Sequence, residues 1–233
     1  MSKNRTVVGK YVFLDIVNYS YGRSIEAQSD IIGAMNALVK NAVSSCKIDK
    51  KSIIFIPTGD GMCIALLDIH DPFDIHMQLA LKIMELLHAY NSSQKDSARK
   101  FEVRMGVNEN TDNLIIDING NNNVAGVGIT EAQRIMDRGG DQIILAGRAV
   151  FNHLRQRERY INKFKEFAIT IKHHEKMLIY QYVDPSLPYL NSNLPSNLDL
   201  FEKFKTTGEQ LKSTFSSMKK LKKYIPQMKQ EQE

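Results

Sequence analysis

Short β-prone runs and long amphipathic runs alternate along this chain in an order that few folds accommodate. The apolar run Tyr11–Asp15 predicts a buried strand that ends in a carboxylate, and residues 25–43 carry apolar side chains mostly at helical spacing. The apolar runs Ser52–Pro57 and Met62–Leu67 flank the segment Thr58–Gly61. An Asp-Gly pair between two such runs predicts a β-hairpin. The chain therefore begins with a strand, a helix and a hairpin.

The alternation continues through residue 183. A second helix is predicted to begin at Asp71-Pro72, and Phe101–Val107 alternates in the manner of a strand. We expect the later elements to be a polar turn at 108–113, strands at Leu114–Ile118 and Gln142–Leu145, helices at Gly128–Arg138 and Ala149–Ile161, and a strand pair over Phe167–Val183 that turns near His174–Lys176. The order β-α-β-β-α-β predicts an α+β domain on the split βαβ, ferredoxin-like plan, a mixed sheet with helices on one face.

The amino-acid composition of the chain changes near residue 185. Residues 1–184 are expected to form the main domain, and the Pro- and Asn-rich stretch 185–200 a linker. Apolar side chains then recur at helical spacing among lysines over 201–233, which predicts a basic amphipathic helical tail. We expect this tail to pack on the domain or on a second subunit. Binding to a membrane surface is the alternative.

Composition narrows the class of protein. The 233 residues are 42% hydrophobic and carry a net charge of +5, of which the tail holds +4, so the rest of the chain is nearly balanced and a nucleic-acid-binding core is not predicted. There is neither an apolar run of membrane-spanning length nor a leader-like start, so we expect a soluble cytoplasmic protein. Cys46 and Cys63 are too few for a disulfide framework and are expected to be reduced.

Two carboxylates are the main candidates for chemistry. If the hairpin lies beside the first strand, Asp15 and Asp60 meet at one edge of the sheet, where they would repel unless a divalent cation lay between them. Mg²⁺ or Mn²⁺ accepts such oxygen ligands and keeps positions open for phosphate. Gly59 and Gly61 leave room for a phosphate chain near the backbone. The backbone amides expected to face these phosphates are those of Val17, Asn18, Tyr19 and Ser20.

Four segments resemble the class III nucleotidyl cyclases, which make cyclic AMP and cyclic GMP. The segments are Phe13–Ser20 (FLDIVNYS), Thr58–Gly61 (TGDG), Val103–Val107 (VRMGV) and Gly126–Arg134 (GVGITEAQR). The resemblance extends over roughly Tyr11–Val183. It implies the class III cyclase fold and a cyclase activity for this chain.

The resemblance also implies roles for individual residues. Asp15 and Asp60 correspond to the two metal carboxylates, with the Ile16 carbonyl as a further ligand, and two Mn²⁺ or Mg²⁺ ions are implied per site. Arg134 corresponds to the arginine that stabilises the transition state. Members of the family work as head-to-tail homodimers, so Arg134 is expected to serve the site of the other chain. For Arg104, which lies in a predicted strand, two roles stay open: phosphate binding and a salt bridge beneath the sheet.

Three departures from the family pattern concern the substrate. Thr130 stands where the family has an asparagine that binds the ribose, and Ile56 stands where purine cyclases have a lysine or glutamate that reads the base. The second base-reading position is Asn123, whose amide offers both a donor and an acceptor. Because isoleucine cannot read a purine edge by hydrogen bonding, these residues favour a smaller base.

The run Ile56–Gly61 and the pair Lys172-His173 resemble the bacterial pyrimidine cyclases of the Pycsar anti-phage system. That resemblance implies a cyclase of UTP or, less favoured, CTP, whose cyclic UMP or cyclic CMP activates a separate effector protein. Two alternatives stay open: a purine cyclase whose base is read by other residues, and a catalytically silent nucleotide-binding module, which the threonine at position 130 would suit.

Overall fold

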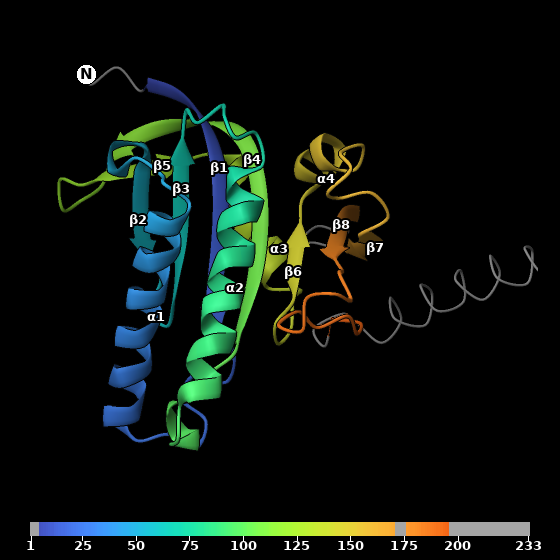
Figure 1. The fold of residues 1–233 in the computed structure, drawn as a ribbon. Helices are drawn as coiled ribbons and strands as arrows, with labels where there is room; N and C mark the ends of the chain where they lie inside the picture. The colour runs from blue at the N-terminus through green and yellow to red at the C-terminus, as the bar shows by residue number, and fades with distance from the viewer. Residues whose placement is uncertain (1–4, 171–175, 196–233) are drawn as a thin grey trace, which may run out of the picture. The chain divides into compact units, whose positions relative to one another are not determined.

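The computed structural model describes residues 5–170 and 176–195, and within them the chain forms one open sheet with helices packed on it (Figure 1). The strands are β1 (Arg5–Ile16), β2 (Ile53–Pro57), β3 (Gly61–Leu67), β4 (Val103–Ile116), β5 (Asn122–Ala125), β6 (Ile144–Ala146), β7 (Phe164–Thr170) and β8 (Lys176–Tyr182). The helices are α1 (Ile25–Ser45), α2 (Ile75–Ser93), α3 (Val127–Met136) and α4 (Arg148–Leu154).

The central strand of the sheet is β1. It pairs antiparallel with β3 on one side and with β4 on the other, and the strand order is β2-β3-β1-β4-β6-β8-β7, with β5 paired to β4. The first four strands in this order, with α1 and α2 as connections, are the split βαβ unit. Because β4 and β6 run parallel, the sheet is mixed. The predicted α+β plan is confirmed.

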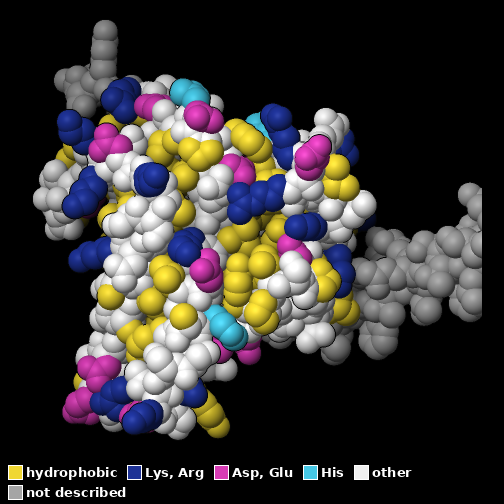
Figure 2. All heavy atoms as spheres, in the orientation of Figure 1, with side chains coloured by type: hydrophobic (Ala, Val, Ile, Leu, Met, Phe, Trp, Pro, Cys, Tyr) yellow, Lys and Arg dark blue, Asp and Glu magenta, His cyan; other side chains and the backbone are white. Residues whose placement is uncertain are grey.

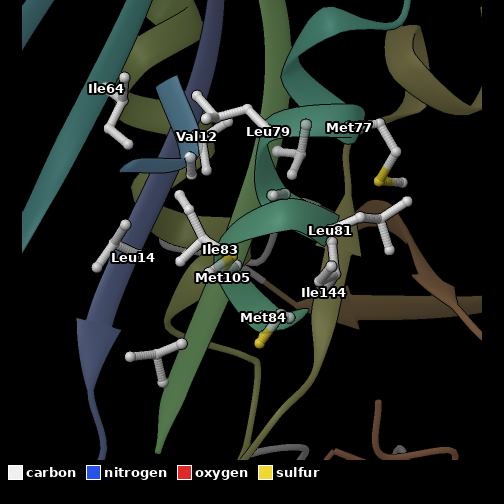
Figure 3. Close-up of a cluster of buried hydrophobic side chains, with 14 of the residues drawn as sticks. Val12, Leu14, Ile64, Met77, Leu79, Leu81, Ile83, Met84, Met105 and Ile144 are labelled. Atoms are coloured by element: carbon white, nitrogen blue, oxygen red, sulfur yellow. The ribbon is translucent and has the colours of Figure 1, made fainter. Parts of the chain in front are cut away.

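The larger core lies between the sheet and the helices α1 and α2. Alternate residues of β1, Val12 and Leu14 among them, point to this face and meet a row of apolar side chains from α2 (Figure 3). The residues labelled there from α2 are Met77, Leu79, Leu81, Ile83 and Met84. Burial of these side chains explains why α2, whose sequence is apolar on nearly all sides, is stable as a helix.

The third helix covers the opposite face of the sheet. Tyr11 and Phe13, the intervening residues of β1, form a second buried cluster with Ala132 and Met136 of α3. The expectation of helices on one face alone is therefore wrong. A Cβ on Gly106 of β4 would overlap the Ala132 carbonyl, so this glycine lets α3 lie directly against the strand.

The polar run 108–113 is not a turn, contrary to the sequence expectation. It lies inside β4, which continues to Ile116 and pairs with all twelve residues of β1. Its buried polar residues are satisfied from the α3 face. The Asn108 side chain, for example, donates to the Gly128 carbonyl at 3.1 Å. The run is polar because Asn108 and Asp112 form hydrogen bonds with α3. Polarity alone does not distinguish a strand that binds a helix in this way from a loop.

Two further boundaries differ from expectation. The short strand β5 returns along β4 after a turn at Asp117–Asn121 and was not predicted. The helix expected over Ala149–Ile161 ends at Leu154, after which the chain turns. The turn brings Tyr160 into the core, where its hydroxyl donates to Asp74 at 2.6 Å.

Residues 184–195 follow β8 along the domain, and Leu190 is buried in the larger core. Three predicted features lie outside the described residues: the tail over 201–233, the turn expected near His174 and the Lys172-His173 pair.

On the face formed by α1 and α2, basic and acidic side chains are interspersed (Figure 2). Among the described residues, no helix is both long and apolar enough to cross a membrane.

Candidate active site

The predicted hairpin forms and lies beside β1. Glycine at position 59, with φ of +90°, and the hydrogen bond from Thr58 N–H to the Gly61 carbonyl close the turn between β2 and β3. Asp15 is opposite Gly61 in the strand register, and the Ile16 amide donates to the Asp60 carbonyl at 3.3 Å. The end of β1 and the tip of the hairpin are thus adjacent.

The two carboxylates are close enough to influence each other. The side chain of Asp15 is 17% exposed, and this burial raises the pKa of its carboxyl. The hydrogen bond from Arg104 opposes the increase, and the negative charge of Asp60 adds to it. A raised pKa beside a second carboxylate is typical of a site that binds a cation.

Arg104 forms a salt bridge with Asp15, which resolves the alternative that the sequence left open. The two residues are opposite each other on β1 and β4, and Arg104 Nη2 and Nε donate to Asp15 Oδ2 at 2.8 and 3.1 Å. The other oxygen, Oδ1, faces the hairpin, where a Cβ on Gly61 would lie 3.0 Å from it. Among the described residues, no ion pair holds Asp60. The two acids are therefore not held in separate ion pairs, and one oxygen of Asp15 faces the hairpin.

This donor set fits a hard divalent cation. Asp15 Oδ1 and the carboxylate of Asp60 supply two anionic oxygens. Because the N–H and C=O of one residue in an antiparallel strand point to the same side, the carbonyl of Ile16 also faces Asp60. The described residues contain no group of three or more His, Cys, Asp or Glu suited to a metal. Two carboxylates and one carbonyl would leave coordination positions of a Mg²⁺ ion for water and phosphate.

The loop after β1 only partly follows the prediction. The Val17 amide donates to the Glu102 carbonyl at 2.9 Å because the pairing with β4 extends one residue past β1, so the expectation that it faces phosphates is wrong. The amides of Asn18, Tyr19 and Ser20 donate to no group in the described part of the chain. Asn18 adopts φ of +52°, which turns the loop away from the strand.

A residue that the sequence analysis missed shapes this loop. The guanidinium of Arg23 donates to the carbonyls of Asn18, Tyr19, Ala98 and Lys100. It thereby ties the loop to the segment before β4. The sequence contains no feature that signals this role, since all four partners are backbone carbonyls and two of them, those of Ala98 and Lys100, are far away in the sequence.

The two residues predicted to read the base lie at one cavity. Ile56 on β2 and Asn123 on β5 line a cavity of about 660 Å³ between the hairpin and the β4–β5 turn. Asn123 Oδ1 accepts the Val124 amide at 2.7 Å, which leaves its Nδ2 as a donor. Ile56 is partly buried against the smaller core. The cavity wall on the β2 side is apolar, and the wall on the β5 side is rich in asparagine.

Helix α3 carries the remaining two predicted residues. The Thr130 hydroxyl donates to the Gly126 carbonyl at 3.1 Å, so its oxygen keeps its lone pairs for another donor. Arg134 is half-buried near the end of the helix, and the described residues offer it no hydrogen bond or ion pair. Its charge is therefore available to an anion.

No protein-family model matches the sequence, and no curated protein matches it either. Solved structures do resemble the chain. The guanylate cyclase domain of RhGC from Catenaria anguillulae, in complex with GTP, aligns with a TM-score of 0.59 at 16% identity over 77% of this chain and 98% of that one. The adenylyl cyclase CyaB from P. aeruginosa aligns with a TM-score of 0.60 at 15% identity, over 78% of this chain and 96% of that one. The guanylyl cyclase Cya2 aligns with a TM-score of 0.64 at 12% identity, over 82% of this chain and 98% of that one.

The chain has the fold of a nucleotidyl cyclase domain. This confirms the fold implied by the resemblance to class III cyclases, and the alignments cover nearly the whole of each cyclase structure. On the cyclase fold, the described residues fall into three groups: the carboxylates at the end of β1 and the hairpin, the cavity lined by Ile56 and Asn123, and α3 with Thr130 and Arg134.

Proposed function

We propose that the protein is a pyrimidine nucleotide cyclase that converts UTP to cyclic UMP and pyrophosphate. The observation that carries this proposal is the juxtaposition of Asp15 and Asp60 on a cyclase fold, with one oxygen of Asp15 turned toward the hairpin. A shared pair of carboxylates beside unpaired loop amides suits a triphosphate bound through divalent cations.

Each residue has a defined task in the proposed reaction. Asp15, Asp60 and the Ile16 carbonyl hold Mg²⁺ or Mn²⁺, and these ions, when bound, neutralise the triphosphate and lower the pKa of the ribose 3′-hydroxyl. The 3′-hydroxyl loses its proton to water, its oxygen bonds to the α-phosphorus, the bond from the α-phosphorus to the oxygen that bridges to the β-phosphorus breaks, and pyrophosphate leaves. Arg134 offsets the charge that develops on the phosphate oxygens, an effect of about 2–4 kcal/mol.

The cavity at Ile56 and Asn123 favours uracil. Because Asn123 Oδ1 already accepts the Val124 amide, while Nδ2 has no partner among the described residues, we take the Nδ2 donor as the group that Asn123 offers to a base. Uracil has a carbonyl acceptor at C4, whereas cytosine has an amino donor there, and two donors facing each other leave both unsatisfied. Ile56 offers a purine no hydrogen bond on the opposite wall.

The proposal includes a head-to-tail homodimer with composite sites, in which Thr130 and Arg134 of one chain serve the carboxylates of the other. The guanidinium of Arg134 has no partner among the described residues, which supports this arrangement, since a cation that serves a partner's substrate needs no partner in its own chain. From the Pycsar resemblance we extend the proposal to anti-phage defence, with the cyclic nucleotide acting on a separate effector.

The direct test is a product assay. Purified protein is incubated with Mn²⁺ and each of ATP, GTP, CTP and UTP, and any cyclic product is identified by mass spectrometry. We expect cyclic UMP from UTP as the main product, with less cyclic CMP. Cyclic AMP or cyclic GMP as the main product would establish the purine alternative, and the absence of any cyclic product would leave a silent nucleotide-binding module.

Two variants control this assay. Asp15→Ala and Asp60→Ala should each abolish cyclisation while the protein remains folded and dimeric, because each removes a metal carboxylate. Circular dichroism and size-exclusion chromatography monitor fold and assembly. Normal turnover by either variant would refute the assigned metal site.

A further inference from the structure

A buried carboxylate on β4, which belongs to none of the predicted site residues, contacts the start of α3. Asp112 is only 5% exposed. Its Oδ1 accepts the Gly128 amide at 3.2 Å and the Asn110 side chain at 3.1 Å, and its Oδ2 accepts the Tyr11 hydroxyl at 2.7 Å and the Ile129 amide at 3.3 Å. Four neutral donors thus surround one buried negative charge.

Helix α3 needs this carboxylate because it has no cap of its own. The residue at its N-cap position is Gly126, which has no side chain to accept the first amides of the helix. Those amides would otherwise be unsatisfied within the protein, and they form the positive end of the helix dipole. Asp112 supplies the missing cap from a neighbouring strand and places its charge where the dipole favours it.

The surroundings are shaped to hold this contact. A Cβ on Gly126 or on Gly128 would overlap the carboxylate of Asp112, so both glycines are needed for the helix to approach the strand this closely. Tyr11 is fully buried, and its hydroxyl fixes the orientation of the carboxyl group. At the same end of α3, the Asn108 side chain donates to the Gly128 carbonyl and to Glu131.

We propose, on the basis of the cyclase function proposed above, that Asp112 is a positioning residue for the reaction. Held by Tyr11, it sets the start and the rotation of α3 and thereby aims Thr130 and Arg134 at the substrate. Thr130 follows the anchored amide of Ile129 directly. Arg134 lies five residues beyond Ile129, about 7.5 Å along the helix. A small change in the contact between Asp112 and the amides of Gly128 and Ile129, which we call the anchor, therefore changes the position of the Arg134 guanidinium.

The variant Asp112→Asn tests this inference with little change in shape. Each oxygen of Asp112 accepts an amide of α3, so whichever of the two becomes NH2 faces an N–H donor, and a repulsive contact replaces a hydrogen bond. We expect kcat for UTP to fall about 10- to 100-fold, since a misplacement of about 1 Å costs this much. KM should change less than threefold. The variant Tyr11→Phe, which removes only the hydroxyl, should lower kcat in the same direction but less.

A combined-variant experiment separates positioning from a general loss of structure. If Asp112 acts through Thr130 and Arg134, then Asp112→Asn should lower the residual rate of the double variant Thr130→Ala/Arg134→Ala by less than twofold. A full 10- to 100-fold loss on that background would overturn the inference. Asp68→Asn is the matched control, because Asp68 also accepts a backbone amide, that of Val8, on the same sheet but at the end of β3. Its kcat should stay within twofold of the wild type.

A readout that does not need activity tests the anchor itself. Hydrogen exchange measured by mass spectrometry should be faster over residues 127–136 in Asp112→Asn, with β2, β3 and α1 unchanged. Exchange unchanged in α3 would overturn the inference even if activity fell. If the wild type makes no cyclic nucleotide, the proposed function and the catalytic half of the inference both fail, whereas faster exchange in the variant would still establish the anchor.

Discussion

At the scale of single residues, the candidate site depends on the different surroundings of the two carboxylate oxygens of Asp15. Arg104 occupies Oδ2 through two hydrogen bonds, and Oδ1 faces the hairpin that carries Asp60. The arginine thus orients the carboxylate and opposes the increase of its pKa that burial causes, and it leaves Oδ1 for a cation. Asn123 is similar, because its Oδ1 accepts the backbone amide of Val124 while its Nδ2 remains as a donor for a ligand.

Truncation of Ile56 tests the apolar wall of the base cavity. Ile56→Ala widens the cavity, so we expect the ratio of kcat/KM for UTP to that for ATP to fall about tenfold, as is usual when a hydrophobic pocket loses a few methylene groups. Steady-state kinetics with both nucleotides measure it. Ile32→Ala, the same truncation against the core at α1, should lower stability but leave the ratio unchanged. An unchanged ratio in Ile56→Ala would exclude this residue from base selection.

At the scale of elements, the position of α3 depends on close contact with β4 along its whole length. Asp112 and Asn108 hold its first turn by hydrogen bonds, Gly106 lets its middle approach the strand, and Arg104 donates to the carbonyl of Asp137 just beyond its last residue at 3.4 Å. The salt bridge to Asp15 and the end of α3 therefore share one arginine.

Adding a methyl group at the closest approach should displace this helix. In Gly106→Ala the new Cβ would overlap the Ala132 carbonyl, so we expect a loss of about 1–3 kcal/mol in the free energy of unfolding together with reduced turnover. Urea denaturation measures the first and the product assay the second. The matched control is Gly33→Ala in α1, where a Cβ has open space and should slightly stabilise the helix. Wild-type stability in Gly106→Ala would contradict the close packing of α3.

At the scale of the whole molecule, the apolar pattern was enough to predict the split βαβ order, because β1 and β3 are short apolar runs buried on both faces and α1 buries one regular face. It failed at β4, where Asn108 and Asp112 are polar and buried because they bind α3. The placement of α3 on the opposite face could not be predicted, since the contact that fixes it joins residues on two elements. The juxtaposition of Asp15 with the hairpin was predictable, whereas its salt bridge with Arg104 was one of two open alternatives.

The proposed dimer makes a prediction about mixed subunits. Alone, Asp60→Ala should be inactive and Arg134→Ala should keep only a small residual rate, because each damages every composite site. When the two are co-refolded in equal amounts, half of the dimers should be mixed and each should contain one intact site, so activity should return to about a quarter of the wild type. The product assay on the mixture measures it. No recovery, with mixed dimers verified by mass spectrometry, would place both residues in a site formed by one chain.

Binding of Mn²⁺ tests the central claim most directly, namely that Asp15 and Asp60 together hold the divalent cations that the substrate needs. Electron paramagnetic resonance counts free Mn²⁺ in the presence of protein and 3′-deoxy-UTP, which binds but lacks the hydroxyl required for cyclisation. We predict that the wild type depletes the free Mn²⁺ signal, and that Asp15→Asn and Asp60→Asn each lose this binding while remaining folded. Wild-type Mn²⁺ binding in both variants would contradict the shared site.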